Sequence, residues 1–561
     1  MIIRGPGARR IPNRSFLLRD KMTSFKTCLL ILVTALTMLY GCITEEDFVI
    51  KDPGTIHPLL AELPVPQGWG VNIHFYNGNT SDLTMLKHAG IGMVRMDVSW
   101  AGIEKETGIY DFSQHDQLIA DLQSRDIGLL FIIDYGNPLY DQGMAPHSVE
   151  GIAAYQQFCA ALAQRYADKG IFWELWNEPN LDHFWTPRGD VDAYMKWCKA
   201  VAPVIRENDP NAVIIAPATS SFDIPFMEAC FKQGLLELVD GISVHPYRNA
   251  WLSPETSWDE YRALDIMIEQ YRPEEKSIPI LSGEWGYSTT YLSPEKQGKY
   301  LARQWLSNTA AGIPVSIWYD WHDDGQDKEN AEHNFGTVTW DYQPKPAYRA
   351  MQTLTSQLNG FSSSGRISLG NADDNLMVFL KGNQAKLAVW TTGDAHQVDL
   401  GEGLSFTDGV AQNGAPIIER DPRNILVSDE PAYFTAADPC PAWLDLIIRT
   451  ESLNNEAAAD IISSVIQGEG KTEAAARIQT AIRGNDGLDR RVAFHVLLNL
   501  SSKLTTDMGL QCYHWILQRE TDELNLKRTL HILAKIGAPQ SMPFVTPLLK
   551  NPHLVQAISD Y

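Results

Sequence analysis

Cysteine is scarce in this sequence, and its few copies are scattered. Seven cysteines occur among 561 residues, with no CxxC pair and no Cys/His cluster. A structural zinc site or a disulfide framework needs such spacing, so neither is expected. The cysteines beyond residue 42 are therefore predicted to be isolated buried thiols, with one disulfide as the open alternative. They are Cys159, Cys198, Cys230, Cys440 and Cys512.

Positive charge is also in short supply. The chain has 46 Lys and Arg against 69 Asp and Glu, a formal net charge of −23 at pH 7. Nucleic acids and anionic membrane surfaces bind clustered Lys and Arg, so neither is an expected partner. A neutral glycan is easier to accommodate beside an acidic surface than a polyanion. No cofactor is predicted.

The acidic stretch from Asp320 to Glu329 invites a calcium hypothesis. Its spacing does not fit an EF-hand loop, because the twelfth position counted from Asp320 is Ala331, where the loop requires a glutamate. A solvated acidic loop is the preferred interpretation, and no metal site is predicted.

Long apolar runs are missing except near the N-terminus. The run from Cys28 to Tyr40 is too short for a comfortable bilayer span, and it follows a basic segment. This order is typical of a signal peptide over residues 1–42. The segment Leu39–Cys42 resembles a bacterial lipoprotein box with Cys42 as the lipidated residue, and an ordinary signal peptide is the alternative. We expect an exported protein at the outer surface or in the periplasm, lipid-anchored to a bacterial membrane.

What the chain does have is a regular alternation of short β-rich runs and amphipathic helical segments. After a proline-containing linker (43–66), eight strand–helix repeats occupy residues 67–355, which predicts a (β/α)8 TIM barrel. A doubly wound sheet is the runner-up, but residues 72–78 are not its glycine-rich phosphate turn. The expected strands are 69–75, 93–98, 128–134, 172–177, 212–216, 241–245, 278–284 and 314–319.

The pattern changes twice after the barrel. Residues 356–438 contain short runs around turn residues, such as 376–380 and 386–390, and predict a small antiparallel β domain. Residues 439–561 show apolar residues at helical spacing and no strand pattern, which predicts an all-helical domain with a HEAT-like succession of helices. A role of this domain in binding a protein partner stays open.

Two carboxylates follow predicted barrel strands. Glu178 stands in Trp176-Asn177-Glu178-Pro179 after the fourth strand, and Glu284 stands at the end of the seventh. Active sites of TIM barrels lie at the carboxyl ends of the strands. Retaining glycosidases need two carboxyl groups roughly 5 Å apart, one as acid/base and one as nucleophile.

With these motifs the chain resembles clan A of the glycoside hydrolases over about residues 67–350. The Asn-Glu-Pro run, the second glutamate and His245-Pro246-Tyr247 carry the resemblance. The segments 70–75, 94–100, 334–336 and 344–348 are most similar to family 39, and families 5 and 30 are alternatives. The resemblance implies that Glu178 is the acid/base and Glu284 the nucleophile.

The same chemistry suggests roles for neighbouring side chains. Asn177 is expected to bind the sugar 2-OH, Tyr247 or His245 to orient Glu284, and Arg95 to keep Glu284 ionised. Glu174 is interpreted as a buried structural partner of Arg95. Further expected substrate contacts are Trp318 as the floor under the sugar, with His74, Asp134 and Tyr135 at other strand ends.

The sequence thus predicts a retaining glycoside hydrolase that cleaves a β-linked poly- or oligosaccharide. The alternative is a non-catalytic glycan-binding lipoprotein that keeps the barrel. Three tryptophans lie on loops after the fourth and sixth strands: Trp185, Trp251 and Trp258. Each is expected either to stack on a sugar or to pack within its loop, and the sequence favours neither interpretation.

Overall fold

The structure, a computed structural model, describes residues 54–551 and 554 apart from short gaps. The gaps are 62, 77, 79, 368, 370, 383, 401–404, 438–452, 454, 471, 484–487, 505 and 522. The predicted signal peptide with Cys42, as well as Cys440, lies outside the described residues.

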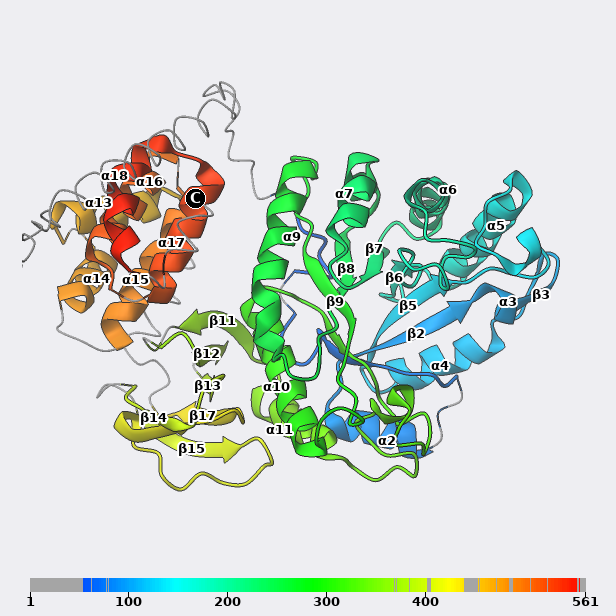
Figure 1. Cartoon of the computed structure of the whole chain (residues 1–561), viewed down its shortest axis with the longest axis horizontal. Helices are drawn as coiled ribbons and strands as arrows, with labels where there is room; N and C mark the ends of the chain where they lie inside the picture. The colour runs from blue at the N-terminus through cyan, green and yellow to red at the C-terminus, as the bar shows by residue number, and fades with distance from the viewer. Residues whose placement is uncertain are drawn as a thin grey trace, which may run out of the picture. The chain divides into compact units, whose positions relative to one another are not determined.

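Eight parallel strands close into a barrel, as the sequence predicts (Figure 1). Strand β10 pairs with β1, so the sheet has no edges and the doubly wound alternative is ruled out. The strands are β1 (Trp69–Asn72), β2 (Met93–Ser99), β5 (Gly128–Asp134), β6 (Phe172–Leu175), β7 (Val213–Ser220), β8 (Gly241–His245), β9 (Ile280–Trp285) and β10 (Ser316–Trp318).

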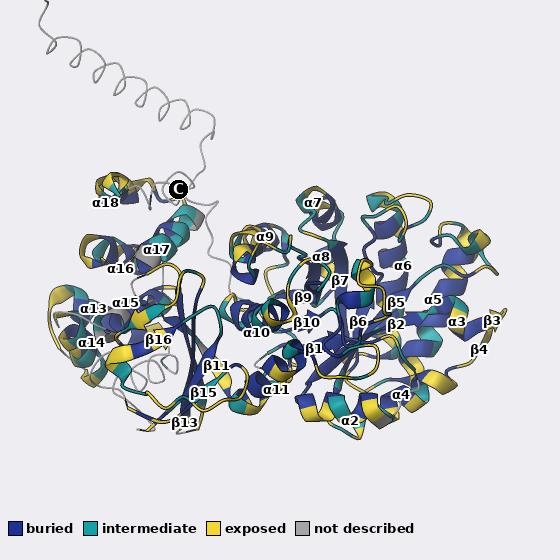
Figure 2. Ribbon diagram, turned by 60° about the horizontal axis from the view of Figure 1, so that its bottom comes forward, coloured by how far each residue is buried: buried dark blue, intermediate teal, exposed yellow. Residues whose placement is uncertain are grey.

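Helices surround the barrel with their apolar faces turned inward, where Figure 2 shows buried residues, while exposed residues face out. Ser148, Asp190 and Ser293 each accept a hydrogen bond from a backbone N–H of the helix that follows, which fixes where α5, α6 and α10 begin. The main helices are α2 (Thr80–Ala89), α4 (Ser113–Gln123), α5 (Val149–Arg165), α6 (Val191–Asn208), α7 (Ile224–Lys232), α9 (Trp258–Tyr271), α10 (Pro294–Ala310) and α11 (Pro346–Leu358).

Shorter elements decorate the loops. Among them is a hairpin of β3 (Glu104–Glu106) and β4 (Ile109–Tyr110), which the alternation pattern did not predict because its strands are so short. The others are α3 (Trp100–Ile103), η2 (Asp141–Gly143), α8 (Leu235–Leu238), η3 (Pro254–Ser257) and η4 (Ala331–Asn334). None of the helices in the described part of the chain combines the length and apolarity needed to cross a bilayer.

The barrel interior has two layers of inward-facing side chains. Toward the N-terminal ends of the strands lies an apolar layer, and its strand residues are Met93, Leu130, Phe172, Val213, Ile215, Leu281, Val315 and Ile317. One strand repeat further on, the inward-facing residues form a polar layer of Asn72, Arg95, Glu174 and Ser243, all buried. Because side chains alternate along a strand, residues two apart such as Met93 and Arg95 share the inner face.

A five-stranded antiparallel sheet follows the barrel in the order β11-β12-β13-β17-β15. Its strands are β11 (Ser362–Ile367), β12 (Asp374–Lys381), β13 (Gln384–Thr391), β15 (Phe406–Ala411) and β17 (Ala432–Ala436), and β14 (His396–Val398) pairs with β16 (Ile425–Val427) beside the short helix η5 (Pro422–Asn424).

Both faces of the central strands β12, β13 and β17 are mostly buried, which explains their continuous apolar runs. Met377, Phe379 and Trp390 belong to the same apolar cluster as the barrel helices. The alternate positions, such as Leu376 and Val389, belong to a cluster with the C-terminal helices.

The last part of the chain is helical, and with it the predicted fold class is confirmed. The helices are α13 (Asn455–Gln467), α14 (Glu473–Arg483), α15 (Leu488–Ser501), α16 (Thr506–Arg519), α17 (Glu523–Ile536) and α18 (Met542–Val545), with η6 (Pro539–Ser541) and η7 (Thr546–Lys550). The predicted helix 442–450 lies outside the described residues.

A buried ion pair joins the sheet to the barrel. Arg303 of α10 donates two hydrogen bonds to Glu255 of η3, at 2.8 and 2.7 Å. The indole N–H of Trp390 on β13 donates to the same carboxylate at 2.7 Å. The Arg303 charge and the hydrogen bonds outweigh burial and lower the pKa of Glu255. This carboxylate is thus satisfied from both parts of the chain.

Candidate active site

The backbone beyond β6 is what turns Glu178 toward the mouth of the barrel. Trp176 has a φ of 74° and Glu178 a φ of 45°, both in the left-handed region that non-glycine residues rarely adopt. The Glu178 N–H donates to the carbonyl of Ala218 on the next strand, β7, at 3.0 Å, which holds the turn in place. Backbone strain of this kind is tolerated where the surrounding structure holds it, typically at functional sites.

A β-bulge turns Glu284 inward. Ser316 and Trp318, two residues apart on β10, pair with Ser282 and Trp285, three residues apart on β9. The extra residue breaks the alternation of side chains. Trp285 packs in the outer core, and Glu284 reaches Arg95 on the inside. Without the bulge, Glu284 would share the outward face of Ser282.

The two predicted catalytic carboxylates are close neighbours. One carboxylate oxygen of Glu178 and one of Glu284 lie within 4.8 Å of each other. Glu178 is 7% exposed, and the Glu284 side chain is 13% exposed. Carboxyl groups of inverting glycosidases stand roughly 6.5–9.5 Å apart to admit a water molecule, so this separation is that of a retaining pair.

Arg95 is the centre of the polar layer. Its Nη1 donates to Glu284 Oε2 at 2.5 Å, its Nη2 to Asn177 Oδ1 at 2.8 Å, and its Nε to Glu174 Oε2 at 2.6 Å. Ser243 donates to the other oxygen of Glu174. The expected structural pairing of Glu174 with Arg95 is thus observed, and the planar guanidinium orients two residues of the site together.

Glu284 is held in its ionised form. Burial raises the pKa of a carboxyl, but His245, Arg95 and a hydrogen bond from Tyr247 together lower the pKa of Glu284 below its ordinary value. The charge of Arg95 is permanent, and its Nη1–H donates directly to the Glu284 carboxylate. An ionised carboxylate is what a nucleophile requires.

The sequence left open whether His245 or Tyr247 orients Glu284, and the two side chains contact different carboxylates. The Tyr247 hydroxyl donates to Glu284 Oε1 at 2.7 Å, so Tyr247 orients Glu284. His245 Nδ1 lies 2.9 Å from Glu178 Oε1, and its Nε2 faces Arg95 Nη2 at 3.3 Å. A guanidinium offers only N–H groups, so Nε2 must accept and Nδ1 carries the proton. His245 therefore donates to Glu178.

The prediction for Trp318 is corrected by the structure. Trp318 has the same strand parity as Ser316, which accepts a hydrogen bond from Asn308 of α10, so both face the helices. Trp318 is fully buried in that outer core. The next residue, Tyr319, has the inward parity of Ile317 and lies among the rings of Tyr247, Phe335 and His74. Sequence alone could not show which of two adjacent aromatic residues faces inward.

Two other expected contacts lie at the mouth. His74 forms an ion pair with Asp320 at 3.2 Å, and although burial lowers its pKa, the Asp320 hydrogen bond and charge raise it to about 9. His74 is therefore a cation at neutral pH. The Tyr135 hydroxyl accepts a hydrogen bond from Asn177 Nδ2 at 3.2 Å. Both side chains stand where a bound sugar can be reached.

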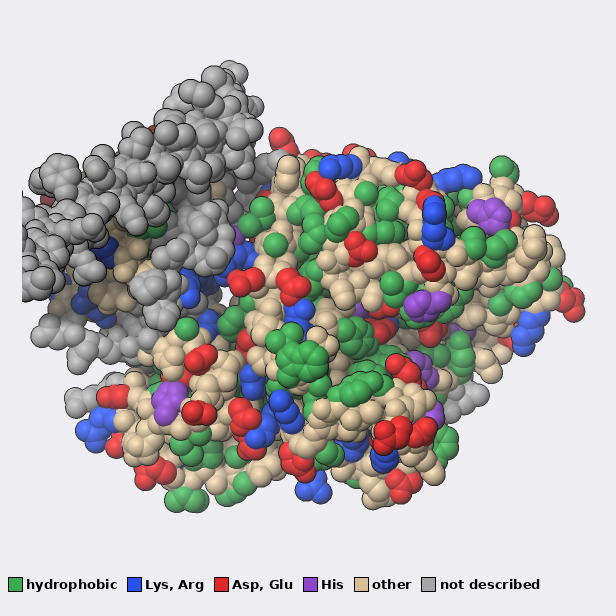
Figure 3. Space-filling model, in the orientation of Figure 1, with side chains coloured by type: hydrophobic (Ala, Val, Ile, Leu, Met, Phe, Trp, Pro, Cys, Tyr) green, Lys and Arg blue, Asp and Glu red, His purple; other side chains and the backbone are tan. Residues whose placement is uncertain are grey.

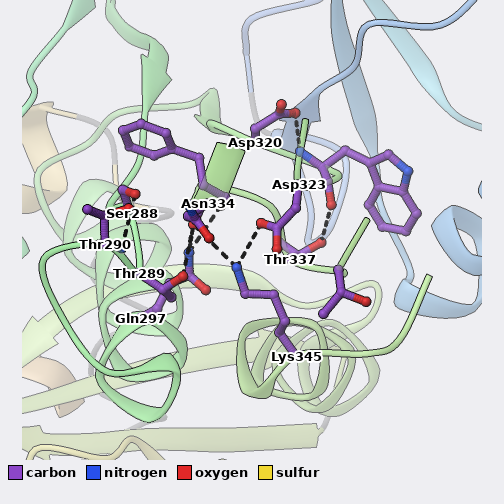
Figure 4. Close-up of polar contacts among 12 residues, drawn as sticks. Ser288, Thr289, Thr290, Gln297, Asp320, Asp323, Asn334, Thr337 and Lys345 are labelled. Atoms are coloured by element: carbon purple, nitrogen blue, oxygen red, sulfur yellow. Dashed lines mark hydrogen bonds and ion pairs between the residues drawn. The ribbon is translucent and has the colours of Figure 1, made fainter. Parts of the chain in front are cut away.

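The acidic stretch after β10 is not a wholly solvated loop. Asp320 and Asp323 are each 1% exposed, which contradicts the solvated interpretation for these two residues. Figure 4 shows Lys345 pairing with Asp323, at 2.9 Å, beside Asn334. The polar cluster fixes the loop that carries Tyr319, and its amide and lysine come from the segments 334–336 and 344–348 noted in the sequence.

Among the residues that the structure describes, two groups of side chains come close enough to hold a metal ion. Glu178, His245 and Glu284 form one, but the Arg95 guanidinium already contacts Glu284 and opposes a cation there. His74, Asp320 and Asp324 form the other, but His74 is protonated at neutral pH and offers no lone pair. Neither donor set fits a metal.

The three loop tryptophans separate into two kinds. Trp185 is 2% exposed and packs on Trp176, and the Trp258 indole donates to the Ser307 carbonyl, so both serve loop packing. Trp251, on the loop after β8, is 73% exposed. On the face shown in Figure 3, hydrophobic side chains stand among interspersed acidic and basic ones.

Comparisons with known proteins agree with this geometry. Residues 60–325 match the family model "Cellulase (glycosyl hydrolase family 5)". The barrel resembles those of clan A of the glycoside hydrolases. A β-xylosidase from Caldicellulosiruptor saccharolyticus is 28% identical over 227 residues, which cover 36% of this chain and 45% of that protein. The chain thus spans less than half the length of this relative.

Two solved structures share the fold of the clan A barrel. A family 39 glycoside hydrolase from Bacteroides cellulosilyticus WH2 superposes with a TM-score of 0.59 and 23% identity, covering 66% of this chain and 81% of that one. A family 39 β-xylosidase from Caulobacter crescentus gives a TM-score of 0.52 and 15% identity, covering 67% and 97%. The predicted resemblance to clan A is therefore confirmed.

Proposed function

We propose that this chain is a retaining glycosidase that hydrolyses a β-linked glycan by double displacement. The observation that carries the proposal is the pair of carboxylates, Glu178 and Glu284, whose oxygens lie within 4.8 Å in two different hydrogen-bonding environments. A relative named β-xylosidase favours a β-linked substrate.

In the first step, a Glu284 oxygen attacks the anomeric carbon. The bond from that carbon to the leaving oxygen breaks, and the proton of Glu178 passes to the leaving oxygen. Arg95 and Tyr247 hold Glu284 in line for the attack. Asn177 is oriented by Arg95 and Tyr135 toward the place of the sugar 2-OH. The product of this step is a glycosyl ester of Glu284.

In the second step, water attacks the anomeric carbon of the ester. The water gives a proton to Glu178, and the bond to Glu284 breaks, which restores both carboxyl groups. Glu178, which gave up its proton in the first step, acts here as the base. His245 donates to Glu178 and stabilises this ionised form.

Proton NMR of the first-formed anomer tests the proposal. A β-linked oligosaccharide or aryl β-glycoside should release the β anomer first, and the α anomer should grow only by mutarotation. Accumulation of the α anomer first would exclude Glu284 as the nucleophile. A panel of β-linked xylan, glucan and mannan substrates identifies the sugar used.

The alternative, a glycan-binding protein without turnover, makes an opposite prediction. It expects measurable affinity for a glycan and no cleavage across the same panel. Burying two carboxylates and Arg95 costs desolvation free energy. This favours the enzyme, because a protein that only binds a glycan has no use for an ionised nucleophile.

We further propose that the protein is exported and anchored through Cys42, on the strength of the N-terminal sequence. Metabolic labelling with a fatty acid in a bacterial host should mark the wild type and leave Cys42→Ala unlabelled. Equal labelling of both would refute the anchor, and protein retained in the cytoplasm would refute export.

A further inference from the structure

A second pair of acidic side chains stands on the wall of the mouth, apart from Glu178 and Glu284. Asp97 lies on β2, two residues beyond Arg95, and therefore on the same inner face one repeat closer to the mouth. Asp134 ends β5, the neighbouring strand, and shares the inner face of Leu130. Both side chains thus point into the barrel at the height of the proposed substrate.

Asp134 is buried without any donor. Its exposed fraction is 0%, and neither of its carboxylate oxygens accepts a hydrogen bond within the described part of the chain. Asp97 on the neighbouring strand, another carboxyl, is the side chain that interacts most strongly with it. Two carboxyl groups can form a hydrogen bond only if one keeps its proton. The buried member keeps it, because burial penalises its charge most.

The electrostatics agree with this geometry. Burial and then the charge and hydrogen bond of Asp97 raise the pKa of Asp134 well above its ordinary value. Burial, with the charge of Asp97, also raises the pKa of Tyr76 to about 12. Asp134 is therefore a neutral acid whose O–H points at Asp97.

Asp97 is the member that a ligand can reach. Its side chain is partly exposed, in contrast to Asp134. Its neighbours include Arg95 below it and His74 after the adjacent strand β1, on both of which its charge acts. Tyr135, next to Asp134 in the chain, bonds Asn177, the expected partner of the sugar 2-OH. The barrel strands that carry these residues follow one another in the order β6, β5 and β2, so Asp97 comes next along this wall after Asn177 and Tyr135.

We propose that Asp97 binds a ring hydroxyl of the sugar, at the position next to the 2-OH, and that Asp134 is a positioning residue that holds Asp97 through a donated proton. The ligand class is a neutral sugar with a free 3-hydroxyl. This inference rests on the proposed function, since the sugar must occupy the space between Glu178 and Glu284.

The test compares p-nitrophenyl β-D-xylopyranoside with its 3-deoxy analogue, using the full chain. Asp97→Ala should lower kcat/KM for the parent glycoside by roughly 10- to 100-fold, the usual effect of losing a hydrogen bond to a charged group. It should leave kcat/KM for the 3-deoxy analogue within about 3-fold of wild type, since that substrate cannot make the bond. Equal effects on both substrates would overturn the assignment.

The positioning role has its own test. Asp134→Asn keeps an N–H donor toward Asp97 and should retain kcat/KM within about 3-fold, whereas Asp134→Ala should lose as much as Asp97→Ala. Equal activity of Asp134→Asn and Asp134→Ala would refute the donated proton. If Asp134→Ala lowers the melting temperature too far for assay, Asp134→Ser supplies a second variant that can donate to Asp97.

Asp209→Asn is a matched control. Asp209 is a buried carboxyl with an oxygen that lacks a described donor, but it follows α6 at the opposite end of the barrel. Its substitution should leave kcat/KM unchanged for both substrates.

Binding separates this inference from the proposed function. Dissociation constants for xylose and 3-deoxyxylose are measured by calorimetry with the same variants. If the wild type binds xylose in an Asp97-dependent manner but hydrolyses neither glycoside, the glycosidase proposal fails and the hydroxyl contact stands. If hydrolysis proceeds but Asp97→Ala changes neither kcat/KM nor binding, the hydroxyl contact fails and the glycosidase proposal stands.

Discussion

The apolar and polar layers of the barrel interior come from the same strands, only two residues apart. Met93 leads to Arg95, and Phe172 leads to Glu174. The apolar layer packs by shape alone, so its residues are interchangeable in kind. The polar layer must satisfy every charge, and Arg95 does so by reaching five side chains at once, those of Asn72, Glu174, Asn177, His245 and Glu284. Stability and chemistry are thus segregated along the barrel axis.

The largest expected loss of activity from a substitution at the polar site comes from Glu284→Gln. The amide keeps the shape of the side chain but cannot attack the anomeric carbon, so kcat should fall by about 10⁴-fold or more. Steady-state hydrolysis and the melting temperature are measured together. A melting temperature close to that of the wild type confines the loss to the chemistry, and near-wild-type turnover would contradict the nucleophile.

Glu178→Ala should have a smaller effect that depends on the leaving group. General acid assistance contributes typically about 10² to 10⁴-fold, and an activated aryl leaving group needs little of it. Turnover of a 2,4-dinitrophenyl glycoside should therefore persist while an oligosaccharide is no longer cleaved. Azide should accelerate release of the glycosyl ester as a glycosyl azide. An equal loss on both substrates would argue against an acid/base role.

A substitution in the apolar layer should lower the stability of the protein and leave its activity almost unchanged. Leu281→Ala removes a fully buried side chain and leaves a cavity, which should lower the free energy of unfolding by about 2–5 kcal/mol. Activity at 25 °C should stay near that of the wild type, because the Leu281 side chain belongs to the apolar layer and carries no group that takes part in the chemistry. Denaturant unfolding and initial rates are the two measurements. A loss of activity without a loss of stability would show that the two layers are not separate.

The smallest effect is expected at the rim. Trp251→Ala removes an exposed indole on the loop after β8 and should raise KM for a long oligosaccharide by roughly 2- to 10-fold, with no change for a short aryl glycoside. Ile418→Ala, an equally exposed apolar residue of the β domain, is the control and should change neither. An unchanged KM for Trp251→Ala would assign this indole no role in substrate binding.

The sequence was sufficient to predict the barrel and the two catalytic candidates, because strand ends in a barrel converge whatever the loops do. It was not sufficient where a single residue of register decides the outcome. The bulge in β9 aims Glu284 inward, and the parity of β10 puts Tyr319 rather than Trp318 in the site. Both depend on pairing between strands, which leaves no mark on the local sequence.

The sequence does contain a signal for the inward position of Asp97. Asp97 stands two residues after Arg95, so any inward position for Arg95 also places Asp97 inward. Asp134 was expected at a strand end as a substrate contact, and its complete burial instead makes it a residue behind the contact. The exposed fraction of a side chain follows from packing, and the sequence pattern does not contain it.

The antiparallel sheet packs on the barrel with one face and on the C-terminal helices with the other, which bears on how such a chain can evolve. Its order along the sequence suggests three interchangeable modules, yet Met377 and Phe379 complete the core of the barrel while Leu376 and Val378 complete that of the helices. Recombination that exchanged only the catalytic barrel would strip one face of the sheet, and loss of the helices would strip the other. The three parts are therefore expected to be inherited together, and to change their shared surfaces in concert.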